Sequence, residues 1–156
     1  MDTITYIFLA FLIFTIARAL FADRSPIPEA SGKVHKITNA AELDALLSST
    51  THVVVDFYAD WCPPCRAIAP IFSELADKHS SNGHLAFAKV NVDHVDDVAG
   101  RYGVSAMPTF LFFQNGAPKG VTVETSKPDV CIDRIRGADR GTLQAVVQAL
   151  ASREKS

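Results

Sequence analysis

Cysteine is scarce in this chain, which has three cysteines among its 156 residues. Three are too few for a disulfide scaffold, and an odd number leaves one thiol without an intramolecular partner. The fold must therefore depend on a hydrophobic core. The chain has the length of a single domain, and the roughly 120 residues after its N-terminal segment are enough to build such a core.

Strong charge of either sign is also absent, because the formal net charge at pH 7 is −2 and the lysines and arginines are scattered. Without a basic run there is no phosphate-binding face, so we expect no nucleic-acid partner. A second C-x-x-C and a paired histidine motif are missing as well. A zinc site needs two ligands beyond a single C-x-x-C, so we expect no metal.

One long hydrophobic run is present, and it lies at the N-terminus. Residues 4–16 are almost wholly apolar, and after an interruption at Arg18 the apolar character continues through residues 19–22. A helix over residues 3–22 is long enough to cross a bilayer, which takes about 20 residues. Arg18 could then extend to the membrane interface.

Three interpretations of residues 1–22 compete. A signal peptide needs a basic start, whereas Asp2 is the only charge before the run, although small residues offer cleavage sites. A mitochondrial presequence should be amphipathic and rich in arginine, and this segment is neither. We favour an uncleaved membrane anchor, with the positive charges after it leaving the main domain in the cytosol. The secretory pathway and the mitochondrion remain the alternatives.

A linker is expected over residues 23–32, where Pro26 and Pro28 favour extended backbone and Ser31-Gly32 loosens it. We therefore place the boundary of the main domain at Lys33. The main domain then covers residues 33–156.

Strand and helix patterns alternate after the linker. The apolar run His52–Tyr58 predicts a strand covered on both faces. Residues 62–79 predict a helix with an apolar face and a kink at Pro70. The other expected strands are 33–37, 85–92, 109–114 and 130–136, and the other expected helices are one beginning after Asn39, 95–102 and 142–151. This order predicts an α/β fold with a central mixed sheet and helices on both faces.

Two cysteines three positions apart, Cys62 and Cys65, stand between the strongest strand and the strongest helix. This context predicts a dithiol–disulfide couple. If the helix begins near Cys62, its N-terminus stabilises a thiolate at that sulfur. Cys65 follows one turn later, close enough to close a disulfide.

Five segments in order now resemble the thioredoxin family, over the chain from about residue 33 to the end. The matching segments are VDFYADWCPPC at 55–65, AKVNVD at 88–93, YGV at 102–104, MPTF at 107–110 and RGA at 136–138. The resemblance implies a thioredoxin fold and a redox role for the cysteine pair. Cys62 would attack a substrate disulfide, and Cys65 would resolve the mixed disulfide.

The resemblance also implies an acid and its partner. Asp56 lies within an apolar run, where burial raises the pKa of a carboxyl. It would be a buried acid beneath Cys65 that takes and returns a proton, with Lys89 as its partner. A solvent-facing Asp56 and a plain exposed Lys89 are the alternatives.

A substrate-binding surface around Cys62 is implied in the same way. The resemblance gives a cis peptide before Pro108 and backbone hydrogen bonds from Met107 to an extended substrate. The flat apolar surface would be formed by Trp61, Met107, Gly137 and Ala138. The alternative for Trp61 is packing in the core. The alternative for Pro108 is a proline that only marks the start of a strand and has no role in binding.

Two features depart from the family pattern. Pro63 and Pro64 stand between the cysteines, where Gly-Pro is the commoner pair, so the redox potential is not fixed by the resemblance. Residues 117–129 lie in an insertion of about a dozen residues, expected as an exposed loop or an extra hairpin. Cys131 follows it and is expected as a half-buried strand residue, with a regulatory thiol or an intermolecular bridge as alternatives.

Our main hypothesis is a membrane-tethered enzyme that reduces protein disulfides without a bound cofactor. By resemblance, its electron donor is thioredoxin reductase, a flavoprotein that uses NADPH. A disulfide oxidase or isomerase in an oxidising compartment is one alternative. A thioredoxin-like interaction module without turnover is the other.

Overall fold

The computed structural model describes residues 2–124 and 129–154, and its central sheet is mixed, as the sequence predicts. The sheet order is β1-β3-β2-β4, formed by Val34–Ile37, Leu85–Asn91, His52–Tyr58 and Thr109–Gln114. β1, β3 and β2 are parallel, whereas β4 runs antiparallel to β2. Two short strands, β5 (Ala117–Pro118) and β8 (Arg134–Arg136), pair with β4.

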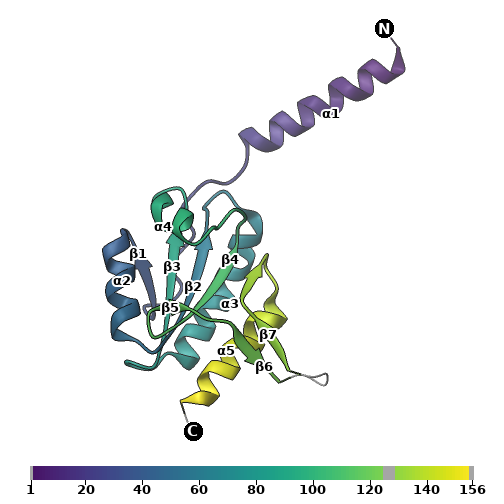
Figure 1. Ribbon diagram of the computed structural model, residues 1–156. Coiled ribbons are helices and arrows are strands. Elements are labelled where there is room, and N and C mark those ends of the chain that lie inside the picture. The colour runs from purple at the N-terminus through teal and green to yellow at the C-terminus, as the bar shows by residue number, and fades with distance from the viewer. Residues whose placement is uncertain (1, 125–128, 155–156) are drawn as a thin grey trace.

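Helices cover both faces of this sheet (Figure 1). On one face, Val54 of β2 packs in a cluster with residues of α3 (Pro63–His79) and α5 (Arg140–Arg153). On the other face, Val53 and Val55 pack with residues of α2 (Ala40–Ser49) and α4 (Asp96–Arg101). The alternation along β2 explains its unbroken apolar run, because every side chain of the strand needs cover on one face or the other.

Side-chain caps fix where two of these helices begin. Asn39 accepts a hydrogen bond from the Glu42 amide at 3.0 Å, and the Glu42 carboxylate accepts one from the Thr38 amide at 2.8 Å. Asn39 therefore caps the helix that the sequence predicts to begin after it. The last helix begins two residues before the predicted Thr142, because Asp139 caps it by accepting from the Thr142 amide at 3.0 Å.

The predicted strand over residues 130–136 is wrong as a single element. Its first half, β7 (Val130–Ile132), pairs with β6 (Val121–Val123) in a separate two-stranded sheet. Its second half, β8, pairs with β4 in the main sheet. The chain changes sheets at Asp133, because one straight strand cannot follow both partners. β6 and β7 form the extra hairpin, and residues 125–128 of the insertion lie outside the described residues.

The N-terminal helix α1 (Thr3–Leu20) stands apart from the domain, with none of its residues buried. It leaves from the end of the sheet at which β2 ends (Figure 1). Its length and composition would allow it to cross a membrane, and a signal sequence near the N-terminus would meet the same criteria.

Residues 23–31, which we call the strap, lie against the domain. Ile27 is buried, and its amide donates to a carboxylate oxygen of Asp60 at 3.0 Å. The Ser31 hydroxyl bonds to Asp77 of α3 at 2.5 Å. The stretch expected as a linker therefore makes specific contacts along its length.

Candidate active site

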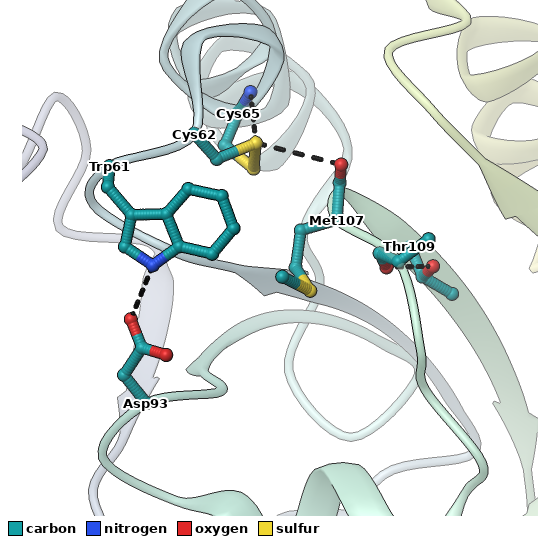
Figure 2. The surroundings of a disulfide bond; sticks show 7 residues. Trp61, Cys62, Cys65, Asp93, Met107 and Thr109 are labelled. Atoms are coloured by element: carbon teal, nitrogen blue, oxygen red, sulfur yellow. Dashed lines mark hydrogen bonds between the residues drawn. A yellow bond between two sulfur atoms is a disulfide. The ribbon is translucent and has the colours of Figure 1, made fainter. Parts of the chain in front are cut away.

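The redox pair lies after the end of β2, at the start of α3. Cys62 is the N-cap of α3, and it forms a disulfide with Cys65 across a Cα–Cα distance of 5.3 Å. The Cys65 amide donates to the Cys62 sulfur at 3.3 Å (Figure 2). Pro63 occupies the first helical position, where its missing N–H costs no helical bond. The sequence therefore places one sulfur at the helix N-terminus and the other one turn inside.

The electrostatics of this position favour a thiolate at Cys62. The first amides of an α-helix have no intrahelical acceptor, and the helix dipole is positive at this end. A thiol at a helix N-terminus consequently has a lowered pKa and reacts as a nucleophile. Cys62 and Cys65 are both buried, in a cluster with Tyr58, Ala59 and Ile27 of the strap.

The residues opposite the disulfide come from the segment just before β4. The peptide bond between Met107 and Pro108 is cis. The Met107 carbonyl oxygen lies 3.6 Å from the Cys62 sulfur, as Figure 2 shows. In the disulfide this is a sulfur–oxygen contact, and in the dithiol the Cys62 thiol can donate a hydrogen bond there.

Gly137 contacts the backbone of Pro108. Its amide donates to the Pro108 carbonyl at 2.8 Å, and its φ of +93° is in the left-handed region that favours glycine. Ala138 follows on the surface. The structure thus brings Met107 beside the Cys62 sulfur and Gly137 beside Pro108.

Trp61 precedes the redox pair on the surface. Its side chain is 46 % exposed, which excludes the core-packing interpretation. The indole N–H donates to a carboxylate oxygen of Asp93 at 2.8 Å (Figure 2). This bond holds the indole beside Cys62, where it widens the apolar surface around the sulfur.

Asp56 is buried in β2, and only 4 % of its surface is exposed. Its Oδ1 atom has no hydrogen-bond partner among the described residues. Burial raises the pKa of Asp56 from 3.8 to about 7, and the positive charge of Lys89 opposes that rise. The carboxyl therefore changes protonation near neutral pH.

Lys89 lies opposite Asp56 in the pairing of β2 with β3. Its side chain is 11 % exposed, which excludes a plain surface lysine. Its ammonium bonds to Glu29 of the strap at 2.5 Å and lies 5.6 Å from the centre of the Tyr58 ring. Lys89 thus lies between the buried acid and a second carboxylate.

A small cavity joins these groups to α3. Its volume is about 20 Å³, which is room for one water molecule. Asp56, Lys89 and Ser73 line it together with Ile27 and Ala69. Ala69 also packs against the cluster that contains Cys65, one helical turn away. The cavity therefore lies one turn of α3 away from Cys65.

The sequence analysis assigned no role to several residues that support the site. The side-chain Nδ2 of Asn91 donates to the second Asp60 oxygen at 3.0 Å, and the side-chain Oδ1 of Asn91 accepts from the Asp93 backbone amide at 3.0 Å. These residues lie within the matched motifs, which is the signal that could have identified them. The strap gave no such signal, since Ile27 is a single apolar residue between prolines.

The insertion lies away from the disulfide, toward the end of the domain opposite α1 (Figure 1). Cys131 on β7 is exposed, so the half-buried interpretation is wrong. Its sulfur lies 3.9 Å from a carboxylate oxygen of Asp133. Within residues 2–124 and 129–154, no three His, Cys, Asp or Glu side chains gather as a metal site would require.

This geometry supports dithiol–disulfide exchange, which makes the chain a thiol–disulfide oxidoreductase. The thioredoxin family model matches residues 33–136. A thioredoxin-like protein of Fusarium culmorum is 55 % identical over 75 % of this chain and 90 % of its own length. A thioredoxin of Neurospora crassa is 49 % identical over 77 % of this chain and 88 % of its own length.

Solved structures agree with these sequence relatives. A Malassezia sympodialis thioredoxin superposes with a TM-score of 0.62 and 31 % identity, covering 81 % of this chain and 98 % of its own. The chain belongs to the thioredoxin family. It is an enzyme of the thioredoxin type, a protein-disulfide reductase.

Proposed function

We propose that the protein reduces disulfides of other proteins through a mixed disulfide on Cys62. In the dithiol form, the Cys62 thiolate attacks one sulfur of the substrate disulfide, and the other sulfur leaves as a thiolate. Cys65 then attacks the Cys62 sulfur, closes the Cys62–Cys65 disulfide and releases the reduced substrate. Two electrons pass from the enzyme to the substrate. The observation that carries this proposal is the position of Cys62 at the N-terminus of α3.

The Cys65 step needs a proton acceptor, and we assign that role to Asp56. A carboxyl whose pKa is about 7 is suited to take a proton at neutral pH and to return it. The cavity between Asp56 and α3 is large enough for one water molecule to relay the proton. Lys89 would limit the rise in the Asp56 pKa, because its ammonium favours the charged carboxylate.

Substrate would bind as an extended segment across the surface around Cys62. The backbone of Met107 would pair with the segment, in the manner of a short added strand. Trp61, Pro108, Gly137 and Ala138 would supply the apolar contacts beside it. Partial exposure of Trp61 and Met107 supports this assignment.

The oxidised enzyme would be reduced again by thioredoxin reductase, with electrons from NADPH. Pro63 and Pro64 between the cysteines keep a disulfide oxidase or isomerase as the second candidate, because these residues help to set the redox potential. An interaction module without turnover is the third. The intact pair of cysteines with a buried acid beneath it favours an enzyme over a module.

The proposed location is a membrane, with α1 as the anchor and the domain in the cytosol. The exposed apolar surface of α1 supports an anchor, since none of its side chains is covered by the domain. Arg18 near its C-terminal end and Arg24 after it favour the cytosolic side for the domain.

Trapping with Cys65→Ser tests the mechanism. Without the resolving thiol, the mixed disulfide on Cys62 should accumulate and survive non-reducing electrophoresis. The double variant Cys62→Ser with Cys65→Ser is the matched control and should trap nothing. Failure of Cys65→Ser to trap any protein would favour the interaction module.

A further inference from the structure

The strap makes non-covalent contacts with the first turn of α3, which carries the redox pair. Arg66, one residue after Cys65, donates through Nη2 to the Ser25 carbonyl and lies 3.5 Å from a carboxylate oxygen of Asp23. Ile27 packs in the same cluster as the two cysteines. These contacts fix the strap beside the active site from Asp23 onward.

The connection between the strap and α1 is short. Phe21 and Ala22 alone separate the end of α1 at Leu20 from Asp23. Three residue steps span at most about 11 Å of extended chain. An open groove of about 380 Å³ lies between α1 and the active-site loop, with Arg18 and Phe21 on one side and Trp61 and Pro63 on the other.

We infer that the enzyme acts on protein disulfides close to the surface of the membrane that holds α1, an inference that rests on α1 being the proposed anchor. A clamped strap and a short connection prevent the domain from turning Cys62 far from that surface. A disulfide held at the same depth meets Cys62 at a high effective concentration. When a substrate protein is anchored in the same membrane but carries its disulfide far from the bilayer, that disulfide seldom meets Cys62.

The test uses the full chain in phosphatidylcholine vesicles. Two synthetic single-span peptides carry the same disulfide loop, about 5 or about 30 residues from the span. The near loop should be reduced at least about 10-fold faster than the far loop. Arg66→Ala combined with a flexible insert of about 30 residues after Ala22 should remove most of that difference.

Equal rates for the two loops with the wild-type chain would overturn the inference. If the chain does not float with vesicles, the anchor and the inference fail together. Reduction of soluble insulin by the same preparation separates both failures from a failure of the reductase function. Loss of insulin reduction by the Arg66→Ala variant that carries the insert would instead show that the insert damages the enzyme. Arg66→Ala without the insert is therefore measured beside it.

A second observation concerns Glu29 in the strap. One of its carboxylate oxygens bonds to the Lys89 ammonium at 2.5 Å, and the other lies 3.8 Å from the Lys36 ammonium on β1. Lys89 is the cation whose charge acts on Asp56. The strap therefore brings a competing carboxylate to the partner of the buried acid.

The other titratable groups around Asp56 leave Lys89 as its main electrostatic partner. Tyr58 is on the same strand, and burial raises its pKa to about 12, so the phenol is neutral at pH 7. Cys65 is on α3, one turn before the cavity residue Ala69, and carries charge only as a thiolate. Glu29 bonds to Lys89, and Lys36 lies 3.8 Å from the other Glu29 oxygen, so both charges are on the far side of Lys89's bond to Glu29.

We propose that Glu29 is a positioning residue that holds the Lys89 ammonium away from Asp56, so that the acid can both take a proton from Cys65 and return it. This proposal rests on the role given to Asp56 above. Without Glu29, Lys89 is free to approach the unpartnered Asp56 oxygen. An ion pair formed there would keep Asp56 charged at a lower pH.

Glu29→Gln tests this role through the titration of Asp56, followed by infrared or carbon NMR signals of its carboxyl. The midpoint should fall by about one pH unit, and the pH profile of the Cys65 step should move with it. Glu74→Gln, which removes an exposed charge from α3, is the matched control and should leave the midpoint unchanged. An unchanged midpoint in Glu29→Gln overturns the positioning role. If Asp56→Asn leaves the Cys65 step unaltered, the proposed role of Asp56 fails instead.

Discussion

The strap and the β6–β7 hairpin are two additions at different ends of one domain. The strap precedes the family match, packs Ile27 against the redox pair and makes polar contacts to Asp60, Arg66 and Lys89. The hairpin buries Val121 and Val123 in the cluster under α5, away from the disulfide. An addition that reaches titratable groups can change the chemistry, whereas one that reaches only the core changes stability.

The largest expected effect contrasts the cysteines at the two ends. Cys62→Ser should abolish reduction of insulin by the enzyme, because the attacking sulfur is lost. Cys131→Ser on the hairpin should leave the rate unchanged, since this thiol is exposed and distant from the site. Activity retained in Cys62→Ser would remove the assigned nucleophile, and activity lost in Cys131→Ser would break the contrast.

The next effect is on stability and comes from the buried acid. The Asp56 pKa is 3.8 in an unfolded chain and about 7 in the folded one, so the folded state binds the proton more tightly. Wild-type stability should therefore fall as pH rises from about 4 to about 7 and level off above. Relative to Asp56→Asn, the loss is on the order of 4 kcal/mol. Denaturant unfolding of both proteins across this pH range measures it, and parallel curves would show that Asp56 has no raised pKa.

The same variant should slow turnover by a smaller factor. Asn cannot accept the Cys65 proton, so the Cys65 step in Asp56→Asn should slow by roughly 10- to 100-fold at pH 7. Rapid mixing of the dithiol enzyme with a chromogenic disulfide reports that step. Asp97→Asn, an exposed change on α4, serves as the control. A rate equal to wild type would remove Asp56 from the mechanism.

The smallest effect belongs to the hairpin. Val121→Ala removes buried methyl groups from a residue that is 2 % exposed, so unfolding should become easier by about 2 kcal/mol. The disulfide-reduction rate of the folded protein should stay the same. Thr122→Ala, at an exposed position of the same strand, should change neither quantity. A redox defect in Val121→Ala would contradict the separation of the two ends.

The sequence predicted the parts of the fold that local patterns determine. An apolar run identified β2, and helical spacing after Cys62 identified α3. The contacts of the strap could not be predicted in this way, because Ile27 has no apolar neighbour in the sequence and its partner, Asp60, is remote along the chain. Residues 130–136 divide into two strands because each half pairs with a different strand. The sequence pattern within a strand does not predict which strand it pairs with.

The candidate site followed the same rule. Cys62 and Cys65 were placed by their spacing, and a buried Asp56 was indicated by its apolar neighbours. That Lys89 bonds to Glu29 depends on tertiary packing, because the two residues lie on separate segments. The partner of Trp61, Asp93, was within a matched motif and still had no assigned role.

The reduction potential of the Cys62–Cys65 pair tests the central claim most directly. It is measured on the full chain in detergent, by equilibration with glutathione buffers and alkylation of free thiols. A protein-disulfide reductase should give a value near that of thioredoxin, about −270 mV. A value near that of protein disulfide isomerase, about −180 mV, would contradict the claim and assign the pair to disulfide formation or exchange.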